Sequence, residues 1–253
     1  MRRRLADTVG LALGTLLSPI TGAISRLRQA RMFHPEGIVY EGRVEPIATS
    51  ADLARVGDRL RGDVLVRLSS AWWKNEREWP DVLGLAMRFR DEQDLLFATV
   101  RFPWTTPFAP LATNIRSFLF NHFHAVSPFV VEGLSGRVKL RLRSPRDPNR
   151  SGLPRRTHLA LAVVEGRAAY VLEARRLERP LHSRSWEPIA RVVLEHPIDV
   201  DQSALRFSPF LDGLGLSPVG LVHALRIATY ASSQANRPPA SLMRGNIVIP
   251  AGS

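Results

Sequence analysis

The sequence contains no cysteine. Disulfide bonds, thiolate zinc sites and iron–sulfur clusters are therefore excluded. Lysine is almost as rare, because Lys74 and Lys139 are the only two and 33 of the 35 basic residues are arginine. Acidic residues number 23, which leaves a formal net charge of +12 and a pI of about 11.4. The chain is strongly basic, and guanidinium groups carry almost all of its positive charge.

This charge raises nucleic acid or an anionic membrane surface as partners. The arginines are spread along all 253 residues rather than gathered in one tail, so we expect no nucleic-acid partner. A planar guanidinium also binds carboxylates through paired hydrogen bonds, so the arginines suit carboxylate recognition. The G-x-G-x-x-G and P-loop phosphate motifs, the H-E-x-x-H zinc motif and the G-x-S-x-G nucleophile turn are all absent.

Residues 1–30 begin with basic residues and continue with an apolar stretch. Asp7 interrupts that stretch, which falls short of the roughly 20 apolar residues of a spanning helix. We expect an N-terminal arm or amphipathic helix that packs on the body of the protein, with peripheral contact to a membrane as the alternative. The expected location is the cytoplasm, with membrane association if this arm binds lipid, and the expected state is a homo-oligomer.

Strand patterns dominate from residue 31 to about residue 210, and we expect one domain over 31–253. The clearest strand has Val64, Val66 and Leu68 on one face and Arg67 and Ser69 on the other. Further strands are expected by alternation or by a glycine-bounded hairpin pattern at 83–90, 94–102, 137–143, 157–166, 168–177 and 190–200. About seven or eight such strands indicate an α+β protein with an antiparallel sheet or barrel rather than βαβ units.

Three segments fall outside the strand pattern. The stretch 103–135 is mixed and is expected to hold one or two short helices, and 144–156 is a loop by composition. A helix is expected over about 217–237, with Ser217 as its N-cap and Pro218 in its first turn.

That helix carries Arg226, Tyr230 and Arg237. At about 100° per residue, Tyr230 lies about 40° and Arg237 about 20° around the helix from Arg226, so the three share one face. Nearby cations and a ferric ion favour the ionised phenol, and tyrosinate is an established axial ligand of haem iron. The alternative is a core tyrosine with two solvated arginines.

Two smaller patterns have both a functional and a structural interpretation. His34 precedes a proline and is either a structural histidine or a distal acid/base for peroxide chemistry. Arg67 and Ser69 either form the wet face of their strand, or pair a carboxylate and hydrogen-bond the ring of His34. His122 and His124 are expected to be core or surface residues, because no acidic residue lies near them in the sequence.

Six patches, in this order, resemble the haem catalase superfamily. They are an Arg-x-x-His-x-x-Gly pattern at 31–37, VRLS at 66–69, DVLGLAMRF at 81–89, DLL at 94–96, VDQSALRFSP at 200–209 and RIATYASSQANR at 226–237. The resemblance covers roughly 31–102 and 200–238. It implies an antiparallel barrel of about eight strands, with haem b held between the barrel wall and a C-terminal helix.

The resemblance also implies roles for individual residues. Tyr230 becomes the iron ligand, flanked by Arg226 and by Arg237, which hydrogen-bonds the phenolate. The haem propionates are assigned to Arg31 and Arg67.

The distal side of the haem is assigned to His34 and Ser69. Catalases continue the DLL-type strand with an Asn pair, where Ala98 and Thr99 stand here. Thr99 is therefore the polar candidate at that place, and catalase activity is expected to be weak. The expected function is a haem-dependent peroxidase acting on hydrogen peroxide or an organic hydroperoxide with an unidentified reductant. A non-enzymatic haem-binding or sensing protein is the alternative.

Overall fold

The computed structural model describes residues 37–71, 78–102, 105, 108–177, 185–201, 205–208 and 210–220. The elements along the chain are β1 (Gly37–Pro46), α2 (Ala51–Leu60), β2 (Gly62–Ser70), β3 (Leu83–Phe89), β4 (Gln93–Ala98), α3 (Ala109–Ala112), η2 (Phe118–Phe120), β5 (His122–Ala125), β6 (Phe129–Val131), β7 (Arg137–Arg143), α4 (Arg155–Val164), β8 (Ala169–Arg176), β9 (Glu187–Ile198) and β10 (Leu216–Pro218). Among these described residues, no helix is long and apolar enough to cross a membrane.

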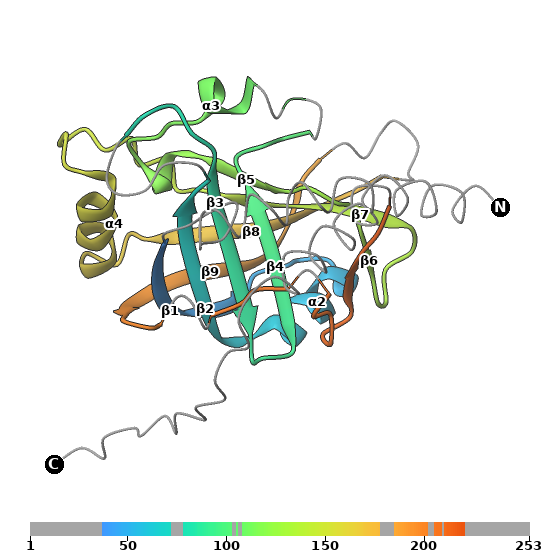
Figure 1. Ribbon diagram of the computed structural model, residues 1–253. Coiled ribbons are helices and arrows are strands. Elements are labelled where there is room, and N and C mark those ends of the chain that lie inside the picture. Colours follow the sequence, from blue (N-terminus) through green and yellow to red (C-terminus); the bar gives the residue numbers. More distant parts are fainter. Residues whose placement is uncertain are drawn as a thin grey trace, which may run out of the picture.

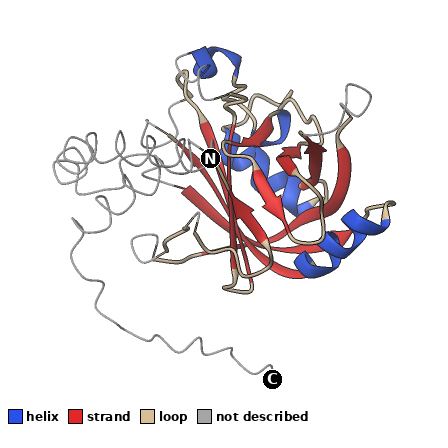
Figure 2. Ribbon diagram, turned by 90° about the vertical axis from the view of Figure 1, so that its right-hand side faces the viewer, coloured by secondary structure: helices blue, strands red, loops and turns tan. Residues whose placement is uncertain are grey.

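Eight strands form a closed antiparallel barrel, in the order β7-β5-β4-β3-β2-β1-β9-β8 (Figures 1 and 2). The ring closes because β8 pairs with β7 along their whole shared length, from Val138 opposite Arg176 to Arg143 opposite Val171. The short strands β6 and β10 extend the sheet beside β7. The expected α+β fold with an antiparallel barrel of about eight strands is confirmed.

The barrel interior is apolar, and strand alternation accounts for it. On β2, Val64, Val66 and Leu68 belong to the central cluster and are at most 3% exposed. Their neighbours Arg67 and Ser69 lie on the outer face. Each fully buried side chain of this size contributes about 1.5–3 kcal/mol relative to exposure, so reversing the faces of one strand by a one-residue slip would be strongly unfavourable.

Helix α2 adds one further face to this core and packs against β1 and β9. Leu53, Val56 and Leu60 recur at helical spacing and are all buried. Gly57 lies on the same face, where an added Cβ would be 2.9 Å from the carbonyl oxygen of Ile189. A residue without a side chain therefore lets the helix approach the strand closely.

The expected strand over 157–166 is wrong, because these residues form most of helix α4. Leu159 and Ala162 are fully buried, while Leu161 is 42% and Val164 is 85% exposed. This burial follows a helical period rather than alternation. The helix ends at Val164, and Gly166 just beyond its C-cap adopts a φ of +68°. The Gly166 amide donates to Val163 O and the Arg167 amide donates to Ala162 O, in the pattern of a Schellman C-cap.

The expected start of the C-terminal helix is also wrong. Ser217 and Pro218 belong to strand β10, which pairs with β6. The Ser217 hydroxyl donates to the carboxylate of Asp212 at 2.6 Å instead of capping a helix. The remainder of the expected helix, 221–237, lies outside the described residues. Within 103–135 the two short helices α3 and η2 are present, but strands β5 and β6 were not expected.

A buried ion pair holds the chain before β10 against the outside of the barrel. Arg88 donates to both oxygens of Asp94, at 2.9 and 2.8 Å, and the Asp94 side chain is fully buried. Arg88 also donates to the carbonyl of Arg206, and the amide of Ser208 donates to Asp94 at 2.6 Å. The hydrogen bond to Asp94 raises the pKa of Arg88. Residues 206–208 are thereby fixed beside β3 and β4.

Gln93, the residue before Asp94, adds further hydrogen bonds to the chain before β10. Its side-chain amide donates to the carbonyls of Leu211 and Leu216, both at 3.1 Å, and its side-chain oxygen accepts from the amide of Leu216 at 3.4 Å. Gln93 is completely buried, so these bonds replace its contacts with water. The segment that leads toward residue 221 is therefore fastened at several points to one strand.

We predict that Asp94→Ala destabilises the fold by about 3–5 kcal/mol, because Arg88 would keep a largely buried charge without its partner. Urea unfolding measures this change in the free energy of unfolding. The control is Asp91→Asn, which removes the charge and tolerates the φ of +59° at this position. Asp91 is 4.0 Å from Arg88, but its side chain is 91% exposed, so its loss should cost less than about 1 kcal/mol. Equal effects of the two substitutions would contradict the anchoring role of Asp94.

Candidate functional site

Small residues line up across the outer face of four adjacent strands. Gly37 on β1 pairs with Ser69 on β2, Ser69 with Gly84 on β3, and Gly84 with Ala98 on β4. Directly paired residues point to the same side of a sheet, and these alternate with core residues on their own strands. We call Gly37, Ser69, Gly84 and Ala98 the outer strip. With only hydrogen, methyl and hydroxymethyl side chains, these four residues project little from the sheet, so this part of the wall is nearly flat.

Arg67 lies in the next row of the same face, paired with Ala86 on β3. It is only 4% exposed, and Ser69 only 5%. The interpretation of these two residues as the solvated face of β2 is therefore wrong. A guanidinium with so little exposure is an uncommon feature, and its planar fork has the geometry that binds carboxylates.

Gly37 determines where the Arg67 side chain can lie. A Cβ added at Gly37 would be 2.8 Å from both Nε and Cζ of Arg67. The guanidinium therefore packs directly over the glycine backbone, at the end of the outer strip. Gly37 is also the glycine of the Arg-x-x-His-x-x-Gly pattern, and its close approach to Arg67 gives that position a physical reason.

Thr99 follows the outer strip at the end of β4, and its hydroxyl is already engaged. The Leu83 amide donates to it at 3.1 Å, and it lies 2.7 Å from the Thr113 hydroxyl. Thr113 donates its own hydrogen to Ala109 O at 2.8 Å, so Thr99 must be the donor between the two threonines. The Thr99 hydrogen is thus committed to holding the segment around α3 and is not free for a ligand.

Two histidines that sequence reasoning left without a role extend the same outer wall. His124 pairs with Ala98 across β4 and β5, one strand beyond the outer strip, and is 9% exposed. Its ring lies 6.5 Å from that of His122 and 6.3 Å from that of Trp186. The N-H-F-H spacing, which places both histidines on one strand face, was the available signal. No group of three metal-ligating side chains forms among the residues that the structure describes.

Burial keeps His124 neutral. Desolvation, followed by the charges of His122, Lys139 and Arg141, lowers the pKa of His124 to about 3. Desolvation and the positive charge of Arg141 also lower the pKa of His122. At neutral pH the wall beside Ala98 therefore presents neutral imidazole rather than imidazolium.

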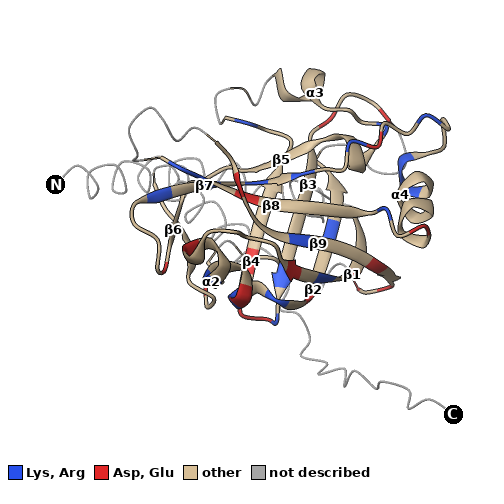
Figure 3. Cartoon of the chain, turned by 180° about the vertical axis from the view of Figure 1, so that it is seen from behind, with Lys and Arg blue, Asp and Glu red and all other residues tan. Residues whose placement is uncertain are grey.

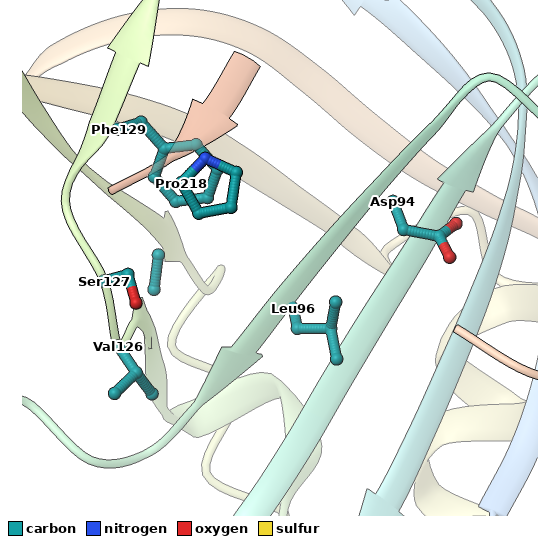
Figure 4. A pocket seen from close by; sticks show the side chains of 7 residues that line it. Asp94, Leu96, Val126, Ser127, Phe129 and Pro218 are labelled. Carbon is teal, nitrogen blue, oxygen red and sulfur yellow. The ribbon is translucent and has the colours of Figure 1, made fainter. Parts of the chain in front are cut away.

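A small cavity lies on the same side of β4, farther from the outer strip. Figure 4 shows Leu96 from β4 near Val126 and Ser127 of the β5–β6 connection. Its volume of about 10 Å³ is enough for about one water molecule. Within the described part of the chain the buried Ser127 hydroxyl has no hydrogen-bond partner, so it can bind such a water. This cavity can hold one water molecule and is too small for an organic substrate.

The remaining residues that the sequence singled out lie outside the described residues. They are Arg31, His34, Arg226, Tyr230 and Arg237. The structure thus places Arg67 and Ser69 side by side on the outer face, with Thr99 at the end of a neighbouring strand. The assignment of an iron ligand to Tyr230 stays a prediction.

Comparison with solved structures identifies the architecture. A fungal catalase superposes with a TM-score of 0.57 at 13% identity, over 85% of this chain and 61% of that protein. Catalase A from Saccharomyces cerevisiae gives a TM-score of 0.56 at 13% identity, over 85% and 63% of the two chains. The chain has a catalase-like fold. It spans somewhat less than two thirds of the length of these catalases.

No protein-family model matches the chain. The search of curated proteins also gives no match. At 13% identity the catalase structures establish the arrangement of the barrel, and function has to be argued from the residues on it.

We predict that acid destabilises the protein through His124. Its folded-state pKa is about 3 against about 6.5 in an unfolded chain. Stability from this group is therefore complete above pH ~6.5 and falls as the pH drops toward 3, by up to ~1.4 kcal/mol per pH unit. Urea unfolding at several pH values measures the slope. His124→Gln should flatten it, whereas His196→Gln, at an exposed position, should not. Identical slopes in all three proteins would refute a buried neutral His124.

Proposed function

We propose that the chain binds haem b on the outer face of the barrel and uses it to react with hydrogen peroxide or an organic hydroperoxide. The observation that carries this proposal is the buried Arg67 beside a strip of small residues. The strip fits the flat face of a porphyrin, and the Arg67 guanidinium fits a propionate carboxylate. The resemblance of the sequence patches to the haem catalase superfamily implies the same location, against the barrel wall, and Arg31 is proposed as the second arginine for the propionates.

The proposed iron ligand is Tyr230, with Arg226 and Arg237 on the same helical face favouring the ionised phenol. Bound haem would supply the redox chemistry of the iron, which no side chain of this chain can provide. Ser69 pairs directly with Gly37, the last residue of the pattern that carries His34. We propose that its hydroxyl bonds one ring nitrogen of His34 and so fixes the tautomer. The other nitrogen would then accept a proton from one peroxide oxygen and return it to the other.

The two residues at the end of β4, Ala98 and Thr99, are the reason to expect weak disproportionation of hydrogen peroxide. Ala98 has no hydrogen-bonding group, and the only hydroxyl hydrogen of Thr99 is directed to Thr113. Neither side chain can donate a hydrogen bond to a second peroxide over the haem. We therefore propose peroxidase turnover with a small organic reductant as the principal activity. The same two residues favour the second candidate, a haem-binding or sensing protein without turnover.

We predict that Arg67→Ala weakens haem affinity by about tenfold or more. Charge-assisted bonds to a carboxylate contribute about 1.5–3 kcal/mol, and ~1.4 kcal/mol is a factor of ten. Absorbance titration with ferric haem measures the change. Gly37→Ala should act in the same direction, because its methyl group displaces the Arg67 side chain. The matched control is Arg43→Ala, an exposed arginine on the outer face of β1. A loss of affinity in the control equal to that in Arg67→Ala would remove the proposed propionate contact.

We predict measurable peroxidase activity and little oxygen evolution in the haem-loaded protein. His34→Ala should lower the peroxidase rate by roughly 10²–10⁴, the usual contribution of a positioned acid/base. Stopped-flow kinetics with a chromogenic reductant and an oxygen electrode measure the two activities. Rapid steady oxygen evolution would contradict the argument about Ala98 and Thr99. An unchanged peroxidase rate in the His34→Ala variant would favour the haem-binding or sensing candidate.

A further inference from the structure

A second concave surface lies on another part of the barrel, over β7, β8 and β9. Four arginines line it: Arg143, Arg146, Arg167 and Arg191. The cleft has a volume of about 660 Å³, within the range of about 300–1,000 Å³ that is usual for organic ligands. Figure 3 faces these three strands and shows basic and acidic segments close together on them. None of these arginines belongs to the outer strip or to the proposed haem site.

The floor of this arginine cleft is apolar. Val171 on β8 pairs with Arg143 on β7 and with Arg191 on β9, so the two arginines flank it in one row. At a strand spacing of about 4.8 Å their backbones are about 10 Å apart. Ala169 continues the floor, and prolines of the 144–148 loop form one wall. An apolar body therefore fits between two guanidinium groups.

The 144–148 loop is held in place by several contacts. The Asp147 amide donates to Leu119 O at 2.8 Å, and the Asp147 carboxylate binds both His158 and Arg167. Arg146 adopts a φ of +62°, a conformation that a residue with a side chain rarely adopts. Such backbone persists only where its surroundings determine it, which makes the cleft a formed feature rather than a surface irregularity.

The charges around the cleft leave an excess of one positive group. Glu173 is shared by Arg141 and Arg143, at 2.6 and 3.0 Å, so one carboxylate serves two guanidinium groups. Arg167 is bound by Asp147 and Glu165.

The other two lining arginines are less engaged. Arg191 reaches Glu45 only at 3.9 Å, with both side chains about half exposed, so that pair is weak. Arg146 is exposed, with no carboxylate within ion-pair distance among the described residues. In and around the cleft there are thus five guanidinium groups and four carboxylates: Arg141, Arg143, Arg146, Arg167 and Arg191 against Glu45, Asp147, Glu165 and Glu173. This balance suits a ligand with one negative charge better than a polyanion.

We propose that the arginine cleft binds an organic monoanion with an apolar body, such as a medium-chain carboxylate. The carboxylate would bind Arg146 and Arg191, and the chain would lie on Val171 and Ala169. Arg143 also lines the cleft, and its Nε atom stays on Glu173 at 3.0 Å. The site is independent of the proposed haem site, because it uses different strands and no residue of the outer strip.

Calorimetric titration of the purified full chain with dodecanoate tests this proposal. Dodecanol and dodecyltrimethylammonium serve as neutral and cationic comparisons on the unmodified protein. We expect saturable binding of dodecanoate at one site, and binding at least tenfold weaker for the other two compounds. The double variant Arg146→Asn/Arg191→Gln should weaken dodecanoate binding by about tenfold or more, because both charge-assisted contacts are lost. Asn is chosen because it tolerates a positive φ.

The matched control is Arg43→Gln, an exposed outer-face arginine that pairs with Glu195 at 3.4 Å and lies outside the cleft. It should bind dodecanoate within twofold of the unmodified protein. Titrations with and without excess ferric haem should give the same affinity, which separates this site from the proposed haem site. Absence of saturable binding, equal binding of the alcohol, or an unchanged affinity in the double variant would each overturn the proposal.

Discussion

The ion pair between Arg88 and Asp94 is the constraint on which the outer face of the barrel depends. Both residues lie on adjacent strands and point away from the apolar core, where an unpaired charge with so little exposure would be costly. The pair is completed by the carbonyl of Arg206 and the amide of Ser208. The chain that returns after β9 is therefore tied across the same strands that form the outer strip. Any segment following residue 220 starts from a point fixed by these bonds.

The two faces of the barrel carry different side chains, and this difference explains where a cofactor can bind. The interior is filled by the apolar side chains of the central cluster. The outer face of β1 to β4 instead carries glycine, serine and alanine next to a buried arginine. The apolar core is complete without the residues of the outer strip. The outer wall can therefore be flat and polar. This arrangement is the physical basis of the haem proposal.

The sequence predicts the barrel because each strand has one buried face. Alternation at Val64, Val66 and Leu68 follows directly from that burial, and the same reasoning holds for β3, β4 and β7. It fails for α4, where Leu159, Leu161 and Val163 mimic alternation although the burial has a helical period. The Schellman cap at Gly166 is a local signal that favours the helix. The prediction from sequence also fails at Ser217, where a residue suited to cap a helix belongs to the short strand β10, which pairs with β6.

The site is only partly predictable, since its decisive contacts join residues far apart in the sequence. Arg67 and Ser69 could be assigned to one strand face, but their burial depends on the rest of the fold. The contact of Arg88 with Arg206 spans 118 residues, and the commitment of the Thr99 hydroxyl requires Thr113 and Ala109. No local pattern encodes these contacts.

The most direct measurement is the absorption spectrum of the purified chain reconstituted with ferric haem, compared with Tyr230→Phe. Haem held between the outer strip and a tyrosinate should saturate at one equivalent and give the Soret and charge-transfer bands of a tyrosinate-ligated ferric haem. The variant should lose those bands, because phenylalanine has no oxygen ligand. Haem that binds without saturation, or a variant with unchanged bands, would contradict the account.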